Sequence, residues 1–240
     1  MLDLIRLEII MGAEKLKILQ NKKVMILGLG GVGGFVSEAL VRSGIRKFTL
    51  VDFDKVSTSN FNRQIIATSE NLGKFKTSVI AERILSINAD AEVEEVKLFI
   101  KKEDIDGLNF DEIDYIIDCI DTSTTKIALI EKAKALEIPI ISAMGFGNKV
   151  NPELIKITDI SKTSVCPLAR VIRVQLRKSN IKKLKVAYSL EQPIEKKQTL
   201  YNDNGKITVG SYVVVIGIAG FKIANEVIFD LLKEGVNLDE

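Results

Sequence analysis

Apolar and polar positions alternate in a regular order over the first 145 residues of the chain. Short apolar runs predict strands at 24–28, 48–52, 92–98, 113–118 and 138–142. Apolar residues at helical spacing predict an amphipathic helix from Leu4 to about Leu19 and further helices at 32–43, 74–87 and 123–136. Strands that alternate with helices in this way are typical of a parallel sheet covered on both faces. We therefore expect an α/β fold with a doubly wound, mostly parallel, Rossmann-like sheet.

The pattern becomes irregular after Met144, although a helix is expected from near Pro167. From Tyr212 a β-branched run resembles a strand, but the apolar residues that follow recur at helical spacing and favour a long C-terminal helix. A chain of 240 residues with 46% hydrophobic residues can bury one substantial core. We expect a single domain over 1–240, with a nucleotide-binding half at 1–145 and a half at 146–240 for substrate RNA and dimer contacts.

A glycine-rich motif, Gly28-Leu29-Gly30-Gly31-Val32-Gly33, joins the first strand to the first helix of the alternating pattern. In this context the backbone amides at the helix N-terminus bind phosphate, so Gly28, Gly30, Gly31 and Gly33 are predicted to bind a nucleotide. Asp52 ends the next strand, at about the spacing where a dinucleotide-binding fold places the acid that binds a ribose hydroxyl.

Polar and charged residues crowd the segment after Asp52, and they include Asp54, Asn60, Arg63 and Gln64. The planar guanidinium of Arg63 can bind phosphate oxygens through two N–H groups, and this favours a triphosphate ligand. Asp54 and Asn60 have an alternative role as turn formers, because short polar side chains stabilise turns.

A second pair of carboxylates, Asp118 and Asp121, follows the strand predicted at 113–118. Ligands of open α/β sheets collect at the carboxyl ends of the strands, so we expect both side chains at that edge. Asp121 is a candidate ligand of Mg²⁺ bound to ATP, since this ion prefers oxygen ligands. Capping the helix that begins at Thr122 is an equally good interpretation of Asp121.

The chain contains no histidine and only two cysteines, Cys119 and Cys166. These counts exclude Ser–His and Cys–His catalysis, histidine-ligated metals and a four-cysteine zinc site within one chain. We expect no zinc and a reducing, cytoplasmic location. The longest apolar stretch, 212–221, is too short to span a bilayer, which leaves peripheral membrane contact open. Cys166 precedes Pro167 at a helix start, where a lowered thiol pKa would suit a sulfur role, but packing is the favoured interpretation.

Several motifs together resemble the signature of the ubiquitin-activating-enzyme superfamily, which includes the bacterial adenylating enzymes of molybdopterin and thiamine biosynthesis. They are the glycine motif, Asp52-Phe53-Asp54, Ser59-Asn60, Asn62-Arg63-Gln64, Gly73 to Lys76, and Asp121. The resemblance implies that Asp52 binds ribose, that Asn60, Arg63 and Lys76 contact phosphates, and that Asp121 binds Mg²⁺. The segment from Arg6 to Gly12 matches a motif whose arginine reaches the ATP of the partner chain, which implies a homodimer.

Later segments resemble the zinc-free branch of this superfamily that acts on tRNA, the tRNA threonylcarbamoyladenosine dehydratases. These segments are 141–149, 159–163, 166–170 and 188–193. The resemblance implies ATP-dependent cyclisation of threonylcarbamoyladenosine in tRNA through an acyl adenylate. The alternative is an adenylyltransferase for a ubiquitin-like sulfur carrier, although those enzymes usually carry paired Cys-x-x-Cys motifs. A sulfur-relay or cysteine desulfurase partner stays open. An NAD-dependent oxidoreductase or a nucleotide sensor is disfavoured by Arg63 and Asp121.

The segment from Ser161 to Lys185 contains basic residues and no acidic residue. Arg170, Arg173 and Arg177 are predicted to share one face of the helix that begins near Pro167, with Lys178 beside them. Such a face can contact an RNA backbone, and we expect a tRNA partner and no DNA. A merely solvated face is the alternative interpretation.

Overall fold

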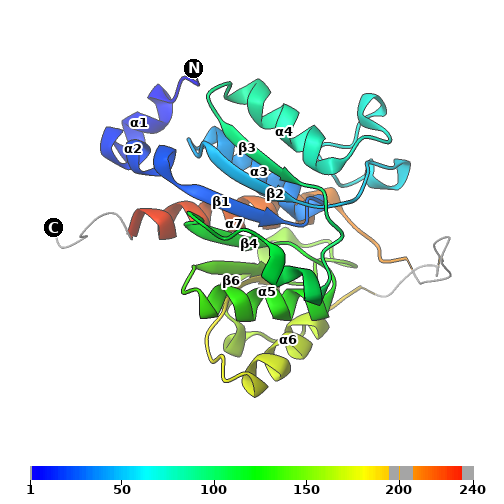
Figure 1. Cartoon of the computed structure of the whole chain (residues 1–240). Coiled ribbons are helices and arrows are strands. Elements are labelled where there is room, and N and C mark those ends of the chain that lie inside the picture. Colours follow the sequence, from blue (N-terminus) through cyan, green and yellow to red (C-terminus); the bar gives the residue numbers. More distant parts are fainter. Residues whose placement is uncertain (1, 195–199, 201–207, 234–240) are drawn as a thin grey trace.

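A seven-stranded sheet forms the centre of the protein, in the strand order β3-β2-β1-β4-β5-β7-β6 (Figure 1). This computed structural model describes residues 2–194, 200 and 208–233. The strands are β1 (Lys23–Leu27), β2 (Lys47–Val51), β3 (Glu92–Val96), β4 (Tyr115–Asp118), β5 (Ile140–Ala143), β6 (Ile155–Asp159) and β7 (Lys185–Ser189). All neighbouring strands are parallel except β6, which pairs antiparallel with β7. The expected doubly wound, mostly parallel sheet is confirmed.

Helices cover both faces of the sheet. They are α1 (Ile5–Met11), α2 (Ala13–Asn21), α3 (Gly31–Arg42), α4 (Lys76–Ile87), α5 (Ser123–Ala135), α6 (Pro167–Lys178) and α7 (Val213–Lys233). Short 3₁₀ helices lie in the connections: η1 (Thr58–Asn60), η2 (Ser69–Asn71), η3 (Lys102–Gly107), η4 (Pro152–Leu154) and η5 (Ile160–Lys162). None of the helices in the described ranges reaches the combined length and apolar character of a membrane span.

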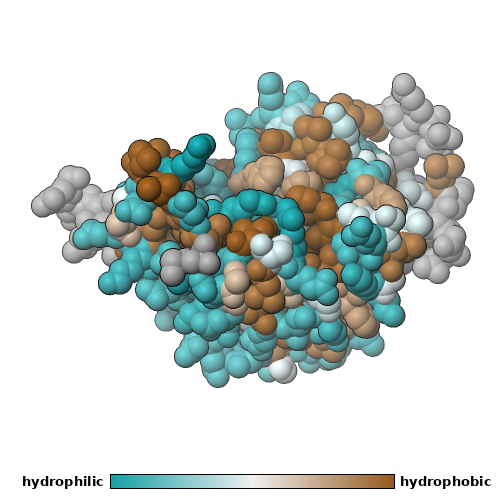
Figure 2. Space-filling view, turned by 90° about the horizontal axis from the view of Figure 1, so that it is seen from above, coloured by the Kyte–Doolittle hydropathy of each residue, from teal (hydrophilic) through white to brown (hydrophobic). Residues whose placement is uncertain are grey.

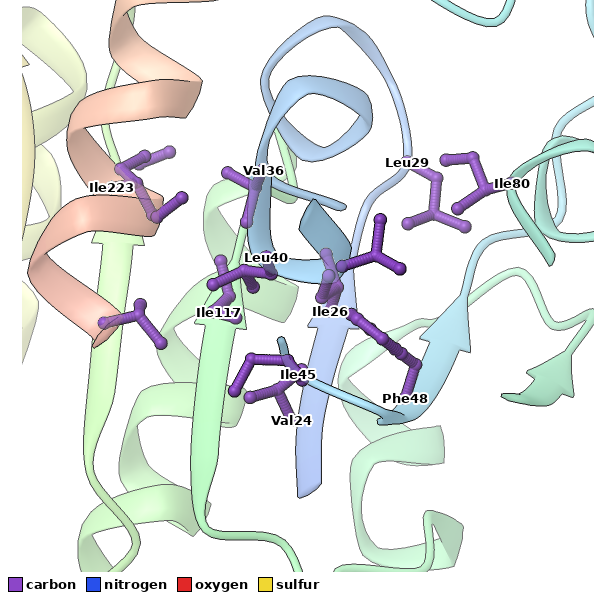
Figure 3. Packing of buried hydrophobic residues seen from close by; sticks show 14 of the residues in the cluster. Val24, Ile26, Leu29, Val36, Leu40, Ile45, Phe48, Ile80, Ile117 and Ile223 are labelled. Atoms are coloured by element: carbon purple, nitrogen blue, oxygen red, sulfur yellow. The ribbon is translucent and has the colours of Figure 1, made fainter. Parts of the chain in front are cut away.

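Alternate side chains of each central strand pack into two separate cores. Val24 and Ile26 of β1 face the core under α3, α4 and α7, whereas Met25 and Leu27 face the core under α5 and α6. Figure 3 shows the first core, where Ile26 lies between residues of α3 and β2. Burial on both faces explains why the strands are nearly continuous apolar runs.

The long C-terminal helix predicted from apolar spacing is confirmed as α7, which packs closely against α3. A Cβ atom at Gly220 would come within 2.6 Å of the Phe35 Cβ and 3.0 Å of the Val32 carbonyl oxygen. Glycine therefore permits the backbones of the two helices to approach. Since both α3 and α7 begin at the same edge of the sheet, this contact also brings Ile216 next to the glycine loop.

Two expectations from the sequence are wrong in detail. The helix predicted from Leu4 to about Leu19 is interrupted at Gly12, whose φ of 85° is left-handed and ends α1. β6 and β7 extend the sheet in the region where the pattern appeared irregular. Both strands have five residues, with β6 at the edge of the sheet and β7 between β5 and β6, and only β7 has an almost wholly buried pattern. β3 ends at Val96, so residues 97–100 leave the sheet and reach the site described below.

Candidate nucleotide site

A cleft of about 450 Å³ opens at the carboxyl ends of β1, β2, β4 and β5, where the strand order reverses direction. Open α/β sheets bind ligands at this topological switch point. Most of the residues predicted from the sequence line it together: Gly28, Gly30, Gly31, Asp52, Asp54, Asn60, Arg63, Gln64, Lys76 and Asp121. Gly33 lies just beneath the glycine loop, and Arg6 lies on the exposed surface of α1.

Close packing determines the shape of the glycine loop. Gly28 has a φ of 87°, and a Cβ atom there would lie 2.6 Å from the carbonyl oxygen of Cys119. A Cβ atom at Gly33 would lie 2.1 Å from the carbonyl oxygen of Gly28. The loop is therefore held against the end of β4, and the N-terminus of α3 faces the cleft with its unpaired amide groups.

Asp52 links the glycine loop to the end of β2. One carboxylate oxygen accepts a hydrogen bond of 2.6 Å from the amide of Leu29, and the other accepts one of 2.8 Å from the amide of Asp54. Each carboxylate oxygen has a second lone pair. The side chain can therefore accept ribose hydroxyl groups while it holds the loop.

Two cations line the cleft. Lys76, the first residue of α4, donates from Nζ to the Asp54 carboxylate at 2.7 Å, and its side chain is 6% exposed against 49% for Asp54. Arg63 donates from one Nη atom to the Ser59 carbonyl oxygen at 2.5 Å and to the Asn62 side chain at 3.0 Å. Because a guanidinium has five N–H groups, Arg63 keeps donors for phosphate oxygens.

The amides of Asn60 and Gln64 differ in their hydrogen bonding. The Asn60 Oδ1 atom accepts from the amide of Ser57 at 3.1 Å, so this side chain stabilises η1 as a turn former would. The Gln64 Oε1 atom is buried and has no hydrogen-bond partner among the described residues. A buried acceptor without a partner is costly, and this oxygen has almost no accessible surface, so it is not open to a ligand in the cleft as the side chain stands.

Asp118 and Asp121 have different environments, although both were expected at the edge of the sheet. Asp121 is exposed, lines the cleft and accepts a hydrogen bond of 3.2 Å from the Thr122 hydroxyl. It precedes the N-cap position of α5, which Thr122 occupies. Asp118 is fully buried, and one of its oxygens accepts from Lys126 Nζ at 2.8 Å and Ser142 Oγ at 2.5 Å. Asp118 thus lies at the predicted end of β4, but its carboxylate is buried and does not line the cleft.

Lys126 is a buried cation that reasoning from the sequence missed. Its Nζ atom also donates to Ser142 Oγ at 3.1 Å and to the carbonyl oxygen of Ala143 at 3.0 Å. The amine thus joins the carboxyl ends of β4 and β5. The only signal in the sequence is that position 126 shares the apolar helical face of Leu129, Ile130 and Ala133.

The two cysteines lie near the cleft in different settings. Burial, together with the neighbouring Asp118 carboxylate, raises the pKa of the Cys119 thiol to about 12. Cys166 is 4% exposed, and its sulfur lies 3.8 Å from the position that a Cβ atom of Gly145 would occupy. A packing role accounts for both side chains.

Apolar residues form two walls of the cleft that the sequence did not predict. We call Phe53, Leu98, Phe99 and Ile100 the β3 wall, because three of them follow β3 directly. The rings of Phe53 and Phe99 meet edge to face with centroids 4.4 Å apart. We call Met144, Phe146, Leu168 and Ile216 the β5 wall, because it is formed by the end of β5 and the first turns of α6 and α7.

The basic helix α6 begins beside the β5 wall. Its predicted start at Pro167 is confirmed, and Arg170, Arg177 and Lys178 are exposed. Arg173 shares their side of the helix, as its spacing predicts, but it is only partly exposed. It donates from Nη1 to the backbone oxygen of Thr163 at 2.9 Å and to its hydroxyl at 2.5 Å, so this side chain supports the turn at η5.

Residues 3–237 match the ThiF family, which is nearly the whole chain. The chain belongs to the ThiF family. A relative from Bacillus subtilis, named tRNA threonylcarbamoyladenosine dehydratase, is 39% identical over 239 residues, or 95% of this chain and 94% of the relative. The dehydratase of Escherichia coli is 37% identical over 166 residues, which cover 69% of this chain and 62% of that protein.

The fold of this chain is also similar to those of solved structures. The crystal structure of the E. coli tRNA N6-threonylcarbamoyladenosine dehydratase TcdA in complex with ATP superposes with a TM-score of 0.86 at 29% identity, covering 95% of this chain and 93% of that one. E. coli MccB with ATP has a TM-score of 0.63 at 24% identity and shares the fold. The resemblance to the superfamily of adenylating enzymes is confirmed.

Proposed function

We propose that this ThiF-family protein is an ATP-dependent enzyme that dehydrates, and so cyclises, threonylcarbamoyladenosine in tRNA. The observation that carries the proposal is the alignment with the B. subtilis dehydratase, which covers nearly the full length of both chains. The alternative, an adenylyltransferase for a ubiquitin-like sulfur carrier, has less support. The adenylyltransferase and sulfurtransferase UBA4 of Vanderwaltozyma polyspora aligns with 55% of this chain and 30% of its own length.

The cleft suits ATP in one orientation. Asp52 lies at the end of β2 and binds the ribose, and the β3 wall beside it holds the adenine. The phosphates then lie over the glycine loop, where Arg63 and Lys76 and the N-terminus of α3 supply positive charge.

The reaction follows from activation of a carboxylate. An oxygen of the threonyl carboxylate attacks the α-phosphorus of ATP, the bond to the β-phosphate breaks, and an acyl adenylate and pyrophosphate form. The ureido group then attacks the activated carbonyl, loses a proton and expels AMP, which keeps the former carboxylate oxygen. Both steps depend on charge neutralisation more than on proton transfer, so Arg63 and Lys76 suffice without histidine.

The residues present fit a Mg²⁺ ion that is held largely by the phosphates of ATP. Among the described residues no group of three or more carboxylate, cysteine or histidine side chains could hold a metal by itself. Mg²⁺ commonly binds one or two carboxylates together with substrate phosphates, and Asp121 offers an exposed carboxylate at the cleft. When bound, the ion would supply charge neutralisation at the phosphates.

A homodimer would complete the site through Arg6. Every residue of α1 is at least partly exposed, and Ile5, Ile9 and Ile10 are 61%, 78% and 78% exposed. Figure 2 shows an apolar patch at the end of the molecule that carries α1. Exposed apolar patches mark protein interfaces, so we propose that a second copy covers α1 and receives Arg6 in its cleft.

Subunit mixing tests this arrangement. In a mixture of Arg6→Ala and Asp121→Ala chains, only a mixed dimer has a cleft with both an intact Asp121 and a partner's Arg6. Random exchange would restore about a quarter of the wild-type AMP formation, because half the dimers are mixed and each has one complete site. No recovery in dimers shown to exchange subunits would contradict action across the dimer.

The exposed cations of α6 are the proposed contacts for the tRNA backbone, with residues 146–240 as the half of the chain that binds substrate. Arg170, Arg177 and Lys178 serve this role, and Arg173 contributes by supporting the helix. We further expect action in the cytoplasm, because both cysteines are free thiols. A sulfur-relay or cysteine desulfurase partner stays a prediction.

The function is tested with purified protein, ATP, Mg²⁺ and threonylcarbamoylated tRNA. We expect mass spectrometry of the digested tRNA to detect a nucleoside lighter by one water, with AMP formed in equal amount. Reactions without ATP should leave the nucleoside unchanged. Unchanged tRNA in the complete reaction, together with adenylation of a sulfur carrier protein in a parallel reaction, would favour the alternative function.

A further inference from the structure

We infer that Asn62 is a positioning residue for the phosphates of ATP. Its side-chain amide holds the guanidinium of Arg63 in one orientation and anchors it to the segment that precedes α7. Asn62 is not among the residues that line the cleft, whereas Arg63 is, so Asn62 acts through Arg63. The inference rests on the proposed function only in taking ATP as the ligand of the cleft.

The hydrogen bonds of Arg63 leave one edge of its guanidinium free. The Nη1 atom has two N–H groups, and it donates to the Ser59 carbonyl oxygen at 2.5 Å and to the Asn62 Oδ1 atom at 3.0 Å. Within the described ranges, Nε and Nη2 of Arg63 make no hydrogen bond. These two nitrogens form one edge of the planar group, and such an edge can bind two phosphate oxygens at once. The contacts at Nη1 therefore leave this edge for a phosphate.

The other end of the Asn62 amide has its own partner. The Nδ2 atom donates to the carbonyl oxygen of Ser211 at 3.1 Å, across 149 residues of sequence. The amide oxygen must face the N–H groups of Arg63 and the amide nitrogen must face the carbonyl, so the two partners together fix the orientation of the amide. Aspartate would place an oxygen against the Ser211 carbonyl, and an apolar residue would lose both contacts. An amide is therefore the group that suits this position.

The carbonyl of Ser211 is a well-supported anchor. The preceding residue, Gly210, is joined to Asn148 in the loop after β5: its amide donates to Asn148 Oδ1 at 2.8 Å, and its carbonyl oxygen accepts from the Asn148 amide at 2.8 Å. On the other side, α7 begins two residues after Ser211. Asn62 thus ties Arg63 to a segment that is fixed at both ends. A cation held in this way is preorganised for the charge that it meets in the cleft.

Binding of ATP and of adenosine tests the role of Asn62. Adenosine has the base and ribose of ATP but no phosphates, so the ratio of the two dissociation constants measures what the phosphates contribute. By titration calorimetry, we expect Asn62→Ala to weaken ATP binding roughly fivefold and to leave adenosine binding unchanged. Arg63→Ala should weaken ATP binding roughly thirtyfold. The double variant should match Arg63→Ala within about twofold, because no guanidinium is left to position.

Asn71→Ala is the matched control. Asn71 makes the same kinds of contact outside the cleft, since its Nδ2 atom donates to the Ile66 carbonyl oxygen at 3.1 Å and its Oδ1 atom accepts from Lys74 Nζ at 3.3 Å. This variant should leave the affinity for both ligands unchanged. Asn62 is exposed, so Asn62→Ala should stay folded, and thermal unfolding checks each variant.

Four outcomes would overturn the inference. Equal weakening of ATP and adenosine binding in Asn62→Ala would indicate a general structural role, and an unchanged affinity for ATP would show that the amide has no role. Losses that multiply in the double variant would show that Asn62 does not act through Arg63. A loss of the same size in the control would show that the effect is not specific to this position. Because the assay contains no tRNA, failure of the protein to dehydrate the tRNA nucleoside would overturn the proposed function and leave this result standing.

Discussion

The ends of β2 and β4 contain the same set of groups, two aspartates and a lysine, in opposite environments. The sets are Asp52, Asp54 and Lys76 at β2, and Asp118, Asp121 and Lys126 at β4. Lys76 and Asp54 are 2.7 Å apart, and Lys126 and Asp118 are 2.8 Å apart. The pairs differ in burial, since Asp54 is 49% exposed and both members of the β4 pair are fully buried.

Burial, and not distance, decides what each lysine can do. The exposed carboxylate of Asp54 can return to water when a phosphate approaches, so Lys76 can exchange one anion for another at low cost. Separation of Lys126 from Asp118 would leave an unpaired charge in the interior. The first pair is therefore suited to binding, whereas the second holds the ends of β4 and β5 together and so positions Asp121.

Of the variants that test this comparison, Asp121→Ala should have the largest effect, a loss of AMP formation. Asp121 is the one carboxylate of the β4 set that lines the cleft, and loss of this proposed Mg²⁺ ligand should lower AMP formation by about three powers of ten. The free energy of unfolding should stay within about 0.5 kcal/mol of wild type, because the residue is exposed. Asp111→Ala, at another exposed carboxylate, is the control. Wild-type AMP formation in Asp121→Ala would show that this carboxylate has no catalytic role.

Lys126→Met should lower the free energy of unfolding. Removal of one member of a buried ion pair typically costs about 3–5 kcal/mol, and denaturant unfolding would measure the loss. The double variant Lys126→Met/Asp118→Leu should recover most of it, since no charge is left unpaired. If the double variant is as unstable as the sum of the single variants, the two side chains are not coupled.

Lys76→Met should impair the reaction with ATP rather than the stability of the fold. Loss of one cation at the phosphates should lower kcat/KM for ATP by about a hundredfold. Lys74→Met, two residues earlier and with a side chain that is 48% exposed, controls for a general change in charge. Equal losses in the two variants would mean that burial of Lys76 against the cleft has no special role.

The smallest expected effect lies outside both sets, on α6. Arg170→Glu/Arg177→Glu should weaken tRNA binding and reduce the slope of log affinity against log salt by roughly one to two. ATP binding should change little, because phosphate contacts on α6 are separate from the cleft. An unchanged salt slope would show that these side chains form only a solvated surface.

The alternating half of the chain could be predicted well because β1, β2, β4 and β5 are almost wholly buried, so that their apolar runs and their burial agree. The glycine motif and Asp52 could be placed together because each follows or ends a parallel strand, and the carboxyl ends of parallel strands meet at one edge of the sheet. Lys126 was missed because a lysine within a helix is usually exposed, and no pattern reveals its partner Asp118. β6 was missed because three of its five residues are only partly buried. Both walls of the cleft depend on distant segments that only the fold brings together.

Transfer of an oxygen isotope tests the central claim, activation of the carboxylate as an acyl adenylate, most directly. The substrate is tRNA in which both oxygens of the threonyl carboxylate are ¹⁸O, in a single turnover with unlabelled ATP and Mg²⁺. Attack on the α-phosphorus and later expulsion of AMP predict one ¹⁸O atom in each AMP released. Label in inorganic phosphate with formation of ADP, or AMP without label, would contradict the mechanism.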